Sequence, residues 1–336
     1  MNSLGIVLGT VQMKSTDRVP VIPQVFGHAA VCNQVPLHKY LRDGRTLAEC
    51  QIQAREKYGY DAVFALMDVN VESEAMGSEI AFRDGMYPHI TKHVLSEAPG
   101  VDGLDVPDPM TDGRMPETLE AIRVARKDVG NEALVASAIL GPFTLTCQLL
   151  GTERALYMLA DDKPKFLEFL RFSEKVAISY GVAQVMAGSH APIMFDPGAT
   201  PSVLPPALFR EIEGPSLTRV RKALAKAGAA GTWLHIAGGT DKVLPSCRSI
   251  GVQIVNFDYD VAPEVAISAL PDVCLDGNIK SLSFCSSSPL AVSQGSKKLL
   301  KTFENRGGFI LSSGCEVPLE ANPECITAMV EAARER

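Results

Sequence analysis

The feature that most constrains the fold is a pattern that recurs along the whole chain. A short apolar run rich in β-forming residues is followed by Gly, Pro or Asp, and then usually by a stretch with helical periodicity. Such alternation favours a parallel sheet covered by helices, because parallel strands need a crossover connection between them. The eight runs are Arg18–Val25, Asp61–Met67, Ala133–Leu140, Ala191–Phe195, Gly231–Leu234, Val252–Phe257, Asp272–Leu275 and Gly308–Leu311.

Eight such units predict an α/β fold of the closed (β/α)8 barrel type, with residues 1–336 forming one domain. An open doubly wound sheet is the alternative, but no glycine-rich dinucleotide-binding sequence follows the first strand. Between the strands, apolar residues recur at helical spacing in Leu47–Tyr58, Pro164–Tyr180, Leu208–Ala227 and Cys325–Arg334.

The connection between the second and third predicted strands is unusually long. Residues 69–131 are too many for a single crossover, and Val101–Met115 is rich in Asp, Gly and Pro. We therefore expect a capping insertion here, with Val101–Met115 as a loop over the active-site end of the barrel.

Composition excludes several classes of partner and location. The net charge is −7 and no basic stripe occurs, which argues against nucleic acid. No run of 18 apolar residues occurs, so no membrane span is expected. Met1–Thr10 has no basic start and no cleavage site typical of a signal peptide. The eight cysteines include no CxxC pair, which fits a reducing cytoplasm.

Polar residues follow many of the predicted strands, and in a (β/α)8 barrel the active site lies at those carboxyl ends. Any one of them equally fits a helix cap or a loop hydrogen bond. The set as a whole, which includes a histidine and a cysteine, favours a functional site. Its members are Gln24, Asp68, Asp196, His235, Asp258, Asp276, Asn278 and Cys315, with His28 expected near the mouth.

His235 and Cys315 follow the fifth and eighth predicted strands. An imidazole and a thiolate that converge on the barrel axis would suit Zn²⁺. From their spacing alone, a hydrogen-bonded buried histidine and an unreactive thiol remain an open alternative. Neither a G-x-S-x-G nucleophile sequence nor a Walker A sequence occurs.

A family resemblance spans Arg18 to Arg334. Taken in order, the segments that carry it are similar to the uroporphyrinogen decarboxylase superfamily, and more closely to its corrinoid-dependent methyltransferase branch. They are Arg18–Val21, Glu56–Ala62, Asp68 with Glu74–Gly77, Gly141–Thr144, Leu234–Gly238, Asp276–Asn278 and Ser312–Pro318.

The resemblance implies a (β/α)8 barrel that moves a methyl group between a corrinoid and an acceptor. The corrinoid would arrive on a small corrinoid-binding protein, and the acceptor would be a small molecule such as tetrahydrofolate or a thiol. Asp68, His235 and Cys315 are the expected catalytic residues. The residues expected to contact the cofactor are Gln24, His28, Asp196 and Asn278.

Two departures from the family pattern affect function. Porphyrinogen decarboxylases carry an arginine-rich MRQAGR sequence after the first strand, where this chain reads Val25-Phe26-Gly27-His28-Ala29-Ala30, and Gln148 stands near the place of their tyrosine. Without those arginines an anionic tetrapyrrole loses charge-assisted contacts, so decarboxylation is disfavoured. It stays an alternative, as does a non-catalytic corrinoid- or tetrapyrrole-binding protein.

The second departure concerns zinc. The methyltransferases bind it through His-x-Cys and a distant Cys, and His235 and Cys315 match the outer two ligands. The middle position is Ala237, which cannot bind metal. Glu316 is therefore the expected third ligand, with Asp258 or another cysteine as alternatives.

Overall fold

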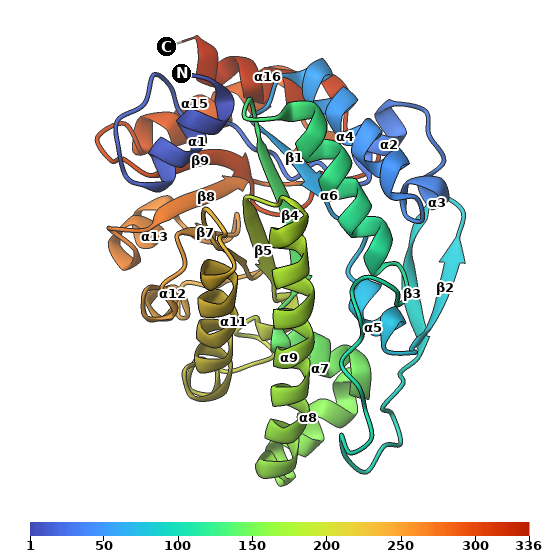
Figure 1. The fold of residues 1–336 in the computed structure, drawn as a ribbon. Coiled ribbons are helices and arrows are strands. Elements are labelled where there is room, and N and C mark those ends of the chain that lie inside the picture. Colours follow the sequence, from blue (N-terminus) through green and yellow to red (C-terminus); the bar gives the residue numbers. More distant parts are fainter. Residues whose placement is uncertain (336) are drawn as a thin grey trace.

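The computed structural model describes residues 1–335 and contains a curled sheet of parallel strands surrounded by helices (Figure 1). Each strand pairs with the next one along the sheet in parallel register. In spatial order the strands are β1 (Ala62–Ala65), β4 (Leu134–Leu140), β5 (Ala191–Phe195), β6 (Trp233–His235), β7 (Ile254–Asn256), β8 (Cys274–Ile279) and β9 (Phe309–Ser313).

Residues 20–22 connect the two edges of this sheet. Val21 forms a parallel bridge with Leu311 of β9, and the Leu311 amide donates to the Pro20 carbonyl at 2.9 Å. On the other side, the Asp61 amide donates to the Val21 carbonyl at 2.9 Å, immediately before β1. The first predicted strand thus lies between the last and the second, and the barrel-like fold expected from the sequence is confirmed.

The strands read as continuous apolar runs because both of their faces are covered. All seven residues of β4 are buried, between side chains inside the barrel and helices outside it. Helix boundaries follow local signals. The Asp43 side chain accepts from the Thr46 amide at 2.6 Å where α4 begins, and Gly59, with a φ of 79°, ends it.

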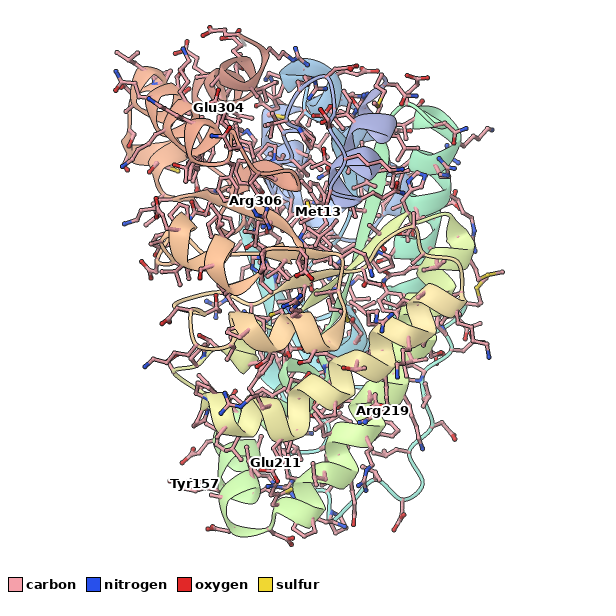
Figure 2. The ribbon with its side chains drawn as sticks, turned by 90° about the vertical axis from the view of Figure 1, so that its left-hand side faces the viewer. Met13, Tyr157, Glu211, Arg219, Glu304 and Arg306 are labelled. Carbon is pink, nitrogen blue, oxygen red and sulfur yellow. The ribbon has the colours of Figure 1, made fainter. Side chains whose placement is uncertain are left out.

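Helices surround the sheet (Figure 1). Two neighbouring helices are α9 (Lys163–Ala187) and α11 (Gly214–Lys226). Arg219 of α11, labelled in Figure 2, donates twice to Glu174 of α9, at 2.7 Å each. The longer helices are α1 (Ser3–Val11), α4 (Gly44–Tyr58), α6 (Met115–Val129), α7 (Pro142–Leu150), α8 (Thr152–Asp161), α9 (Lys163–Ala187), α11 (Gly214–Lys226), α12 (Leu244–Ile250), α13 (Pro263–Ala269), α15 (Pro289–Thr302) and α16 (Pro323–Arg334). Shorter ones are α2 (His28–Cys32), α3 (Leu37–Tyr40), α5 (Val71–Ala75), η1 (Pro197–Ala199), α10 (Pro206–Leu208), η2 (Phe209–Glu213) and α14 (Ser283–Ser286).

The insertion between β1 and β4 contains a hairpin that the sequence analysis did not predict. Strands β2 (Glu79–Arg83) and β3 (Met86–Lys92) pair antiparallel beyond α5. Residues of this hairpin, and none from Val101–Met115, line the pocket at the barrel mouth. The segment Val101–Met115 supplies no lining residue, but Arg114 within it donates to Asp68 of the lining.

Within residues 1–335, no helix combines the length and the apolar character needed to cross a membrane.

Candidate active site

A pocket of about 230 Å³ lies at the carboxyl ends of the strands. It is lined mainly by apolar side chains, with a few polar groups among them. The lining residues are Phe26, Leu66, Met67, Asp68, Val69, Asn70, Tyr87, Pro88, Phe195, Pro197, His235, Ala237, Cys315 and Glu316. Of the predicted catalytic and metal-binding residues, Asp68, His235, Cys315 and Glu316 all lie here.

The side chains of His235 and Cys315 lie next to each other in the pocket lining. The Nε2 atom of His235 lies 3.8 Å from the Sγ atom of Cys315. His235 is the last residue of β6 and is 1% exposed, and its ring lies against Phe195 with centroids 4.6 Å apart. Burial lowers the pKa of His235 to about 4 and raises that of the Cys315 thiol. The pair is therefore a neutral imidazole beside a thiol.

Gln24 holds the far side of the imidazole. Its Nε2 atom lies 3.4 Å from Nδ1 of His235, whereas its buried Oε1 atom has no hydrogen-bond partner. The backbone amide of Gln24 donates to the Ser313 hydroxyl at 3.0 Å, which fixes Gln24 beside the end of β9. Gln24, predicted to contact the cofactor, instead contacts His235 and does not line the pocket.

Cys315 is positioned by the tight turn after β9. A Cβ atom at Gly314 would lie 2.8 Å from the Tyr259 nitrogen, so only glycine fits there. The Ser281 hydroxyl donates to the Cys315 carbonyl at 2.9 Å. These contacts hold the sulfur at the mouth of the barrel.

Asp68 is committed to an ion pair. Arg114 donates to its carboxylate from Nη1 at 2.6 Å and from Nη2 at 3.3 Å, and the Asn70 amide donates at 2.8 Å. The side chains of Asp68 and Arg114 are 1% and 8% exposed. Asp68 thus fixes the loop after β1 on the edge of the pocket, and Arg114 compensates its charge.

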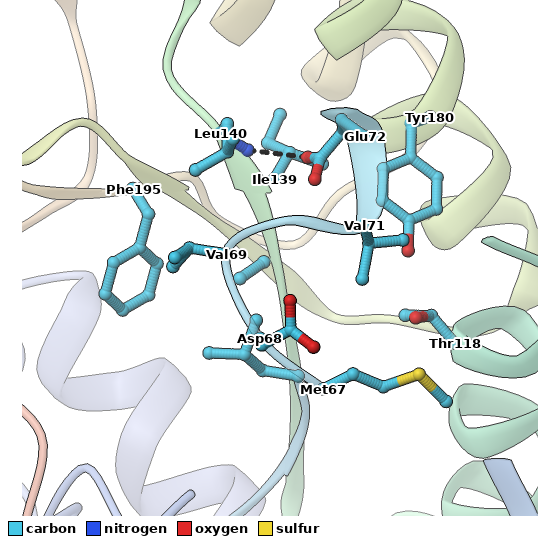
Figure 3. A pocket seen from close by; sticks show the side chains of 12 residues that line it. Met67, Asp68, Val69, Val71, Glu72, Thr118, Ile139, Leu140, Tyr180 and Phe195 are labelled. Atoms are coloured by element: carbon cyan, nitrogen blue, oxygen red, sulfur yellow. Dashed lines mark hydrogen bonds between the residues drawn. The ribbon is translucent and has the colours of Figure 1, made fainter. Parts of the chain in front are cut away.

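A second, much smaller cavity of about 10 Å³ lies behind Asp68 (Figure 3). Its volume suits one water molecule. Glu72 of α5 accepts from the Leu140 amide there at 2.8 Å, and burial raises the pKa of Glu72 to about 7. Its carboxyl group links the insertion to the end of β4.

Glu316, the expected third metal ligand, is hydrogen bonded elsewhere. Its carboxylate accepts from the Tyr87 hydroxyl, which in turn accepts from the Gly27 amide at 2.8 Å. Burial raises the pKa of Glu316 to about 7. Asp258 accepts from the amides of Gly238 and Asp260, at 3.0 Å each.

The zinc site can be tested against these contacts. His235 and Cys315 would supply two ligands, but the methyl side chain of Ala237, which lines the pocket at the third position, has no atom that can bind a metal. In the part of the chain that the structure describes, no group of three or more His, Cys, Asp or Glu side chains is placed to hold a metal ion. The residues present do not complete the three-ligand set, so zinc stays a prediction.

Three residues predicted to contact the cofactor lie outside the pocket. His28 bonds to the Leu319 carbonyl and the Tyr58 hydroxyl, at 2.9 Å each. Asp196 is fully buried and accepts from the amide and hydroxyl of Thr144, at 3.0 and 2.6 Å. Asn278 donates to the carbonyls of Asp258 and Val261. These contacts hold loops and helices together.

The sequence analysis missed most of the apolar lining, including Phe26, Phe195 and Tyr87. For Phe195 a signal existed. Successive residues of a strand point to opposite faces, so either Phe195 or Asp196 faces the pocket, but not both. Asp196 was the residue predicted to contact the cofactor, whereas the structure places Phe195 in the pocket lining.

Comparison with known proteins places this geometry in a family. Uroporphyrinogen decarboxylases of Xanthomonas euvesicatoria pv. vesicatoria and Xylella fastidiosa are 28% and 26% identical over 300 residues, which cover 85% of this chain and 83% of each relative. A methyltransferase from Methanosarcina mazei superimposes with a TM-score of 0.90 at 23% identity, covering 100% of this chain and 99% of that one. A B12-independent methionine synthase from Shewanella sp. W3-18-1 gives 0.60 at 11% identity, covering 97% of each chain. The two structural likenesses show a shared fold. The family described as uroporphyrinogen decarboxylase (URO-D) matches residues 6–336, and the chain therefore belongs to the URO-D family.

Proposed function

We propose that the protein is a methyltransferase that moves a methyl group between a corrinoid and a small-molecule acceptor, either tetrahydrofolate or a thiol. The corrinoid would be carried by a small partner protein that docks at the barrel mouth. The observation that carries the proposal is the His235–Cys315 pair, 3.8 Å apart in an apolar pocket at that mouth. The shared fold with a methyltransferase from Methanosarcina mazei supports it.

Methyl transfer of this kind needs the protein to position the two reactants and to accept one proton. A methylated corrinoid supplies an electrophilic methyl carbon when bound. As the sulfur or nitrogen of the acceptor bonds to that carbon, the electron pair of the broken bond stays with the corrinoid and the acceptor loses a proton. His235 is neutral because burial lowers its pKa to about 4. When the Oε1 atom of Gln24 faces Nδ1, the unprotonated ring nitrogen is Nε2, which can then take up this proton.

The other residues of the pocket arrange the reactants. Gln24 fixes the imidazole from behind, and Cys315 lies against Nε2 where the acceptor must approach. Phe26 and Phe195 line the pocket and are 3% and 7% exposed. They limit the access of water to the reacting atoms.

The lining favours methyl transfer over porphyrinogen decarboxylation. Within residues 1–335 the pocket lining contains no lysine or arginine. A multiply anionic tetrapyrrole would lose its hydration there without gaining charge-assisted hydrogen bonds. The sequence Val25–Ala30, which lacks arginine, agrees with this.

The direct test is loss of the methyl group from methylcobalamin, followed by absorbance, with purified protein and each acceptor class. We expect Cys315→Ala to lower the rate by about 100-fold or more, or about 2.7 kcal/mol of barrier. Cys285→Ala is the matched control, because Cys285 is exposed and does not line the pocket.

The other outcomes separate the alternatives. Unchanged turnover in Cys315→Ala would remove Cys315 from the mechanism. Binding of methylcobalamin without methyl loss for any acceptor would indicate a non-catalytic binding protein, and turnover of a porphyrinogen would indicate a decarboxylase.

A further inference from the structure

We infer that the mouth pocket selects a small, uncharged thiol as the methyl acceptor, in preference to an anionic thiol or a folate. The inference rests on the proposed methyl transfer and adds the chemical class of the acceptor. Three properties of the pocket carry it: its volume, the placement of charge around it, and the aromatic surface beside the sulfur and imidazole.

The volume limits the acceptor to a small molecule. At about 230 Å³ the pocket lies below the range of roughly 300–1,000 Å³ typical of small-molecule sites. Val69 lines the pocket and is 39% exposed, so it lies at the edge of the lining that faces solvent. A folate, with several rings and a charged tail, would leave most of its surface outside. A short thiol fits entirely within.

The charges around the pocket exclude a buried anion. Asp68 and Glu316 are the acidic residues of the lining. The cation nearest to Asp68 is Arg114, which lies behind it and is shared between Asp68 and Glu74. A carboxylate or sulfonate in the pocket would therefore face the Asp68 carboxylate and apolar groups. Among the described residues that line the pocket there is no lysine or arginine to compensate for its lost hydration.

Aromatic rings cover the region next to the reacting atoms. Phe26 and Phe195 meet edge to face, with centroids 5.9 Å apart and an interplanar angle of 70°. Phe195 also lies against the His235 ring. Sulfur makes favourable contacts with aromatic rings, and a neutral thiol enters such a site with little loss of hydration. His235 then lies close enough to accept the thiol proton.

A pair of ligands that differ only in charge tests the inference. The amide 3-mercaptopropionamide is neutral, and 3-mercaptopropionate has the same number of heavy atoms but carries a carboxylate. Calorimetric titration of the whole protein should give a Kd for the amide at least tenfold lower than for the carboxylate. Tetrahydrofolate should bind more weakly than the amide. Equal or tighter binding of the carboxylate or of tetrahydrofolate, or no binding of the amide, would overturn the inference.

Two variants locate the binding in this pocket. Val69→Lys adds a cation at the edge of the pocket and should tighten carboxylate binding several-fold relative to amide binding. Val265→Lys is its control, because Val265 is 44% exposed and does not line the pocket. Ala237→Phe should fill the pocket and abolish amide binding, with the exposed Ala230→Phe as its control. Amide binding that survives in Ala237→Phe would place the ligand elsewhere and overturn the inference.

The same ligands keep this inference separate from the proposed function. If methylcobalamin loses its methyl group to the carboxylate but not to the amide, methyl transfer stands and the selection of an uncharged acceptor is wrong. If the amide binds as described and no thiol accepts a methyl group, the pocket inference stands and the proposed function is wrong.

Discussion

The Ala237→Cys substitution should create a strong zinc site. In a tetrahedral site, Zn–N and Zn–S bonds of about 2.05 and 2.3 Å place the two ligand atoms about 3.6 Å apart. His235 Nε2 and Cys315 Sγ are 3.8 Å apart, so zinc would need a shift of only about 0.2 Å from this pair. Ala237 lines the same pocket, two residues after His235. A thiol there would supply the missing third ligand.

The size of the gain follows from known zinc affinities. Sites with four protein ligands bind zinc with about 10–16 kcal/mol, or roughly 2.5–4 kcal/mol for each ligand. One added thiolate should therefore raise zinc affinity by about 10²–10³-fold. Competition with a chromophoric chelator measures this, and Co²⁺ substitution should show stronger thiolate-to-metal absorbance in the variant than in the wild type.

Ala237→Ser is the control, since a hydroxyl of similar size is a poor zinc ligand. The reasoning is refuted if Ala237→Cys binds zinc no more tightly than the wild type, or if Ala237→Ser gains as much. Either result would mean that position 237 does not point to the His235–Cys315 pair.

Three further predictions concern stability. Burial raises the pKa of Asp276 from 3.8 to about 8, so between these pH values the folded chain keeps a proton that the unfolded chain releases, and the free energy of unfolding falls as pH rises. Asp276→Asn should flatten this dependence in denaturant titrations across pH 4–8, and an unchanged slope would contradict it. Arg114→Met leaves the buried Asp68 carboxylate without its partner and should destabilise the fold by about 3–5 kcal/mol in urea, whereas a wild-type midpoint would show that the pair is dispensable. Tyr87→Phe removes the hydroxyl between Glu316 and the Gly27 amide, which should cost about 1–3 kcal/mol and speed amide hydrogen exchange in β2–β3, and unaltered exchange there would count against this role.

The barrel was predictable because each strand carries its own signal. The run Ala133–Leu140 is apolar except for Ser137 and becomes β4, and the run that ends at His235 becomes β6. The hairpin β2–β3 had a local signal as well, since Asp84-Gly85 at its turn is typical of two-residue hairpin loops. Its strands are exposed or only partly buried at every position but one and lack a continuous apolar face, so periodicity did not reveal them.

The site was predictable only in part. The ends of β6 and β9 brought His235 and Cys315 together, as their positions after strands suggested. Arg114 was not predicted because its contact with Asp68 joins residues 46 positions apart, and no local pattern encodes such a pair. His28 and Asp196 follow predicted strands too, and Asn278 lies within β8. The side chains of all three bond to neighbouring loops and helices.

The side chain of Gln24 has two ends of opposite hydrogen-bonding character, and its orientation sets the tautomer of His235. With the amide nitrogen toward Nδ1, as it lies at 3.4 Å, the ring carries its hydrogen on Nε2 and offers it to Cys315. With the unpartnered oxygen Oε1 turned to Nδ1 instead, the hydrogen moves there and Nε2 presents a lone pair to a proton or a metal. A half-turn of the Gln24 side-chain amide thus decides whether Nε2 of His235, which faces the Cys315 sulfur, donates a hydrogen bond or accepts one.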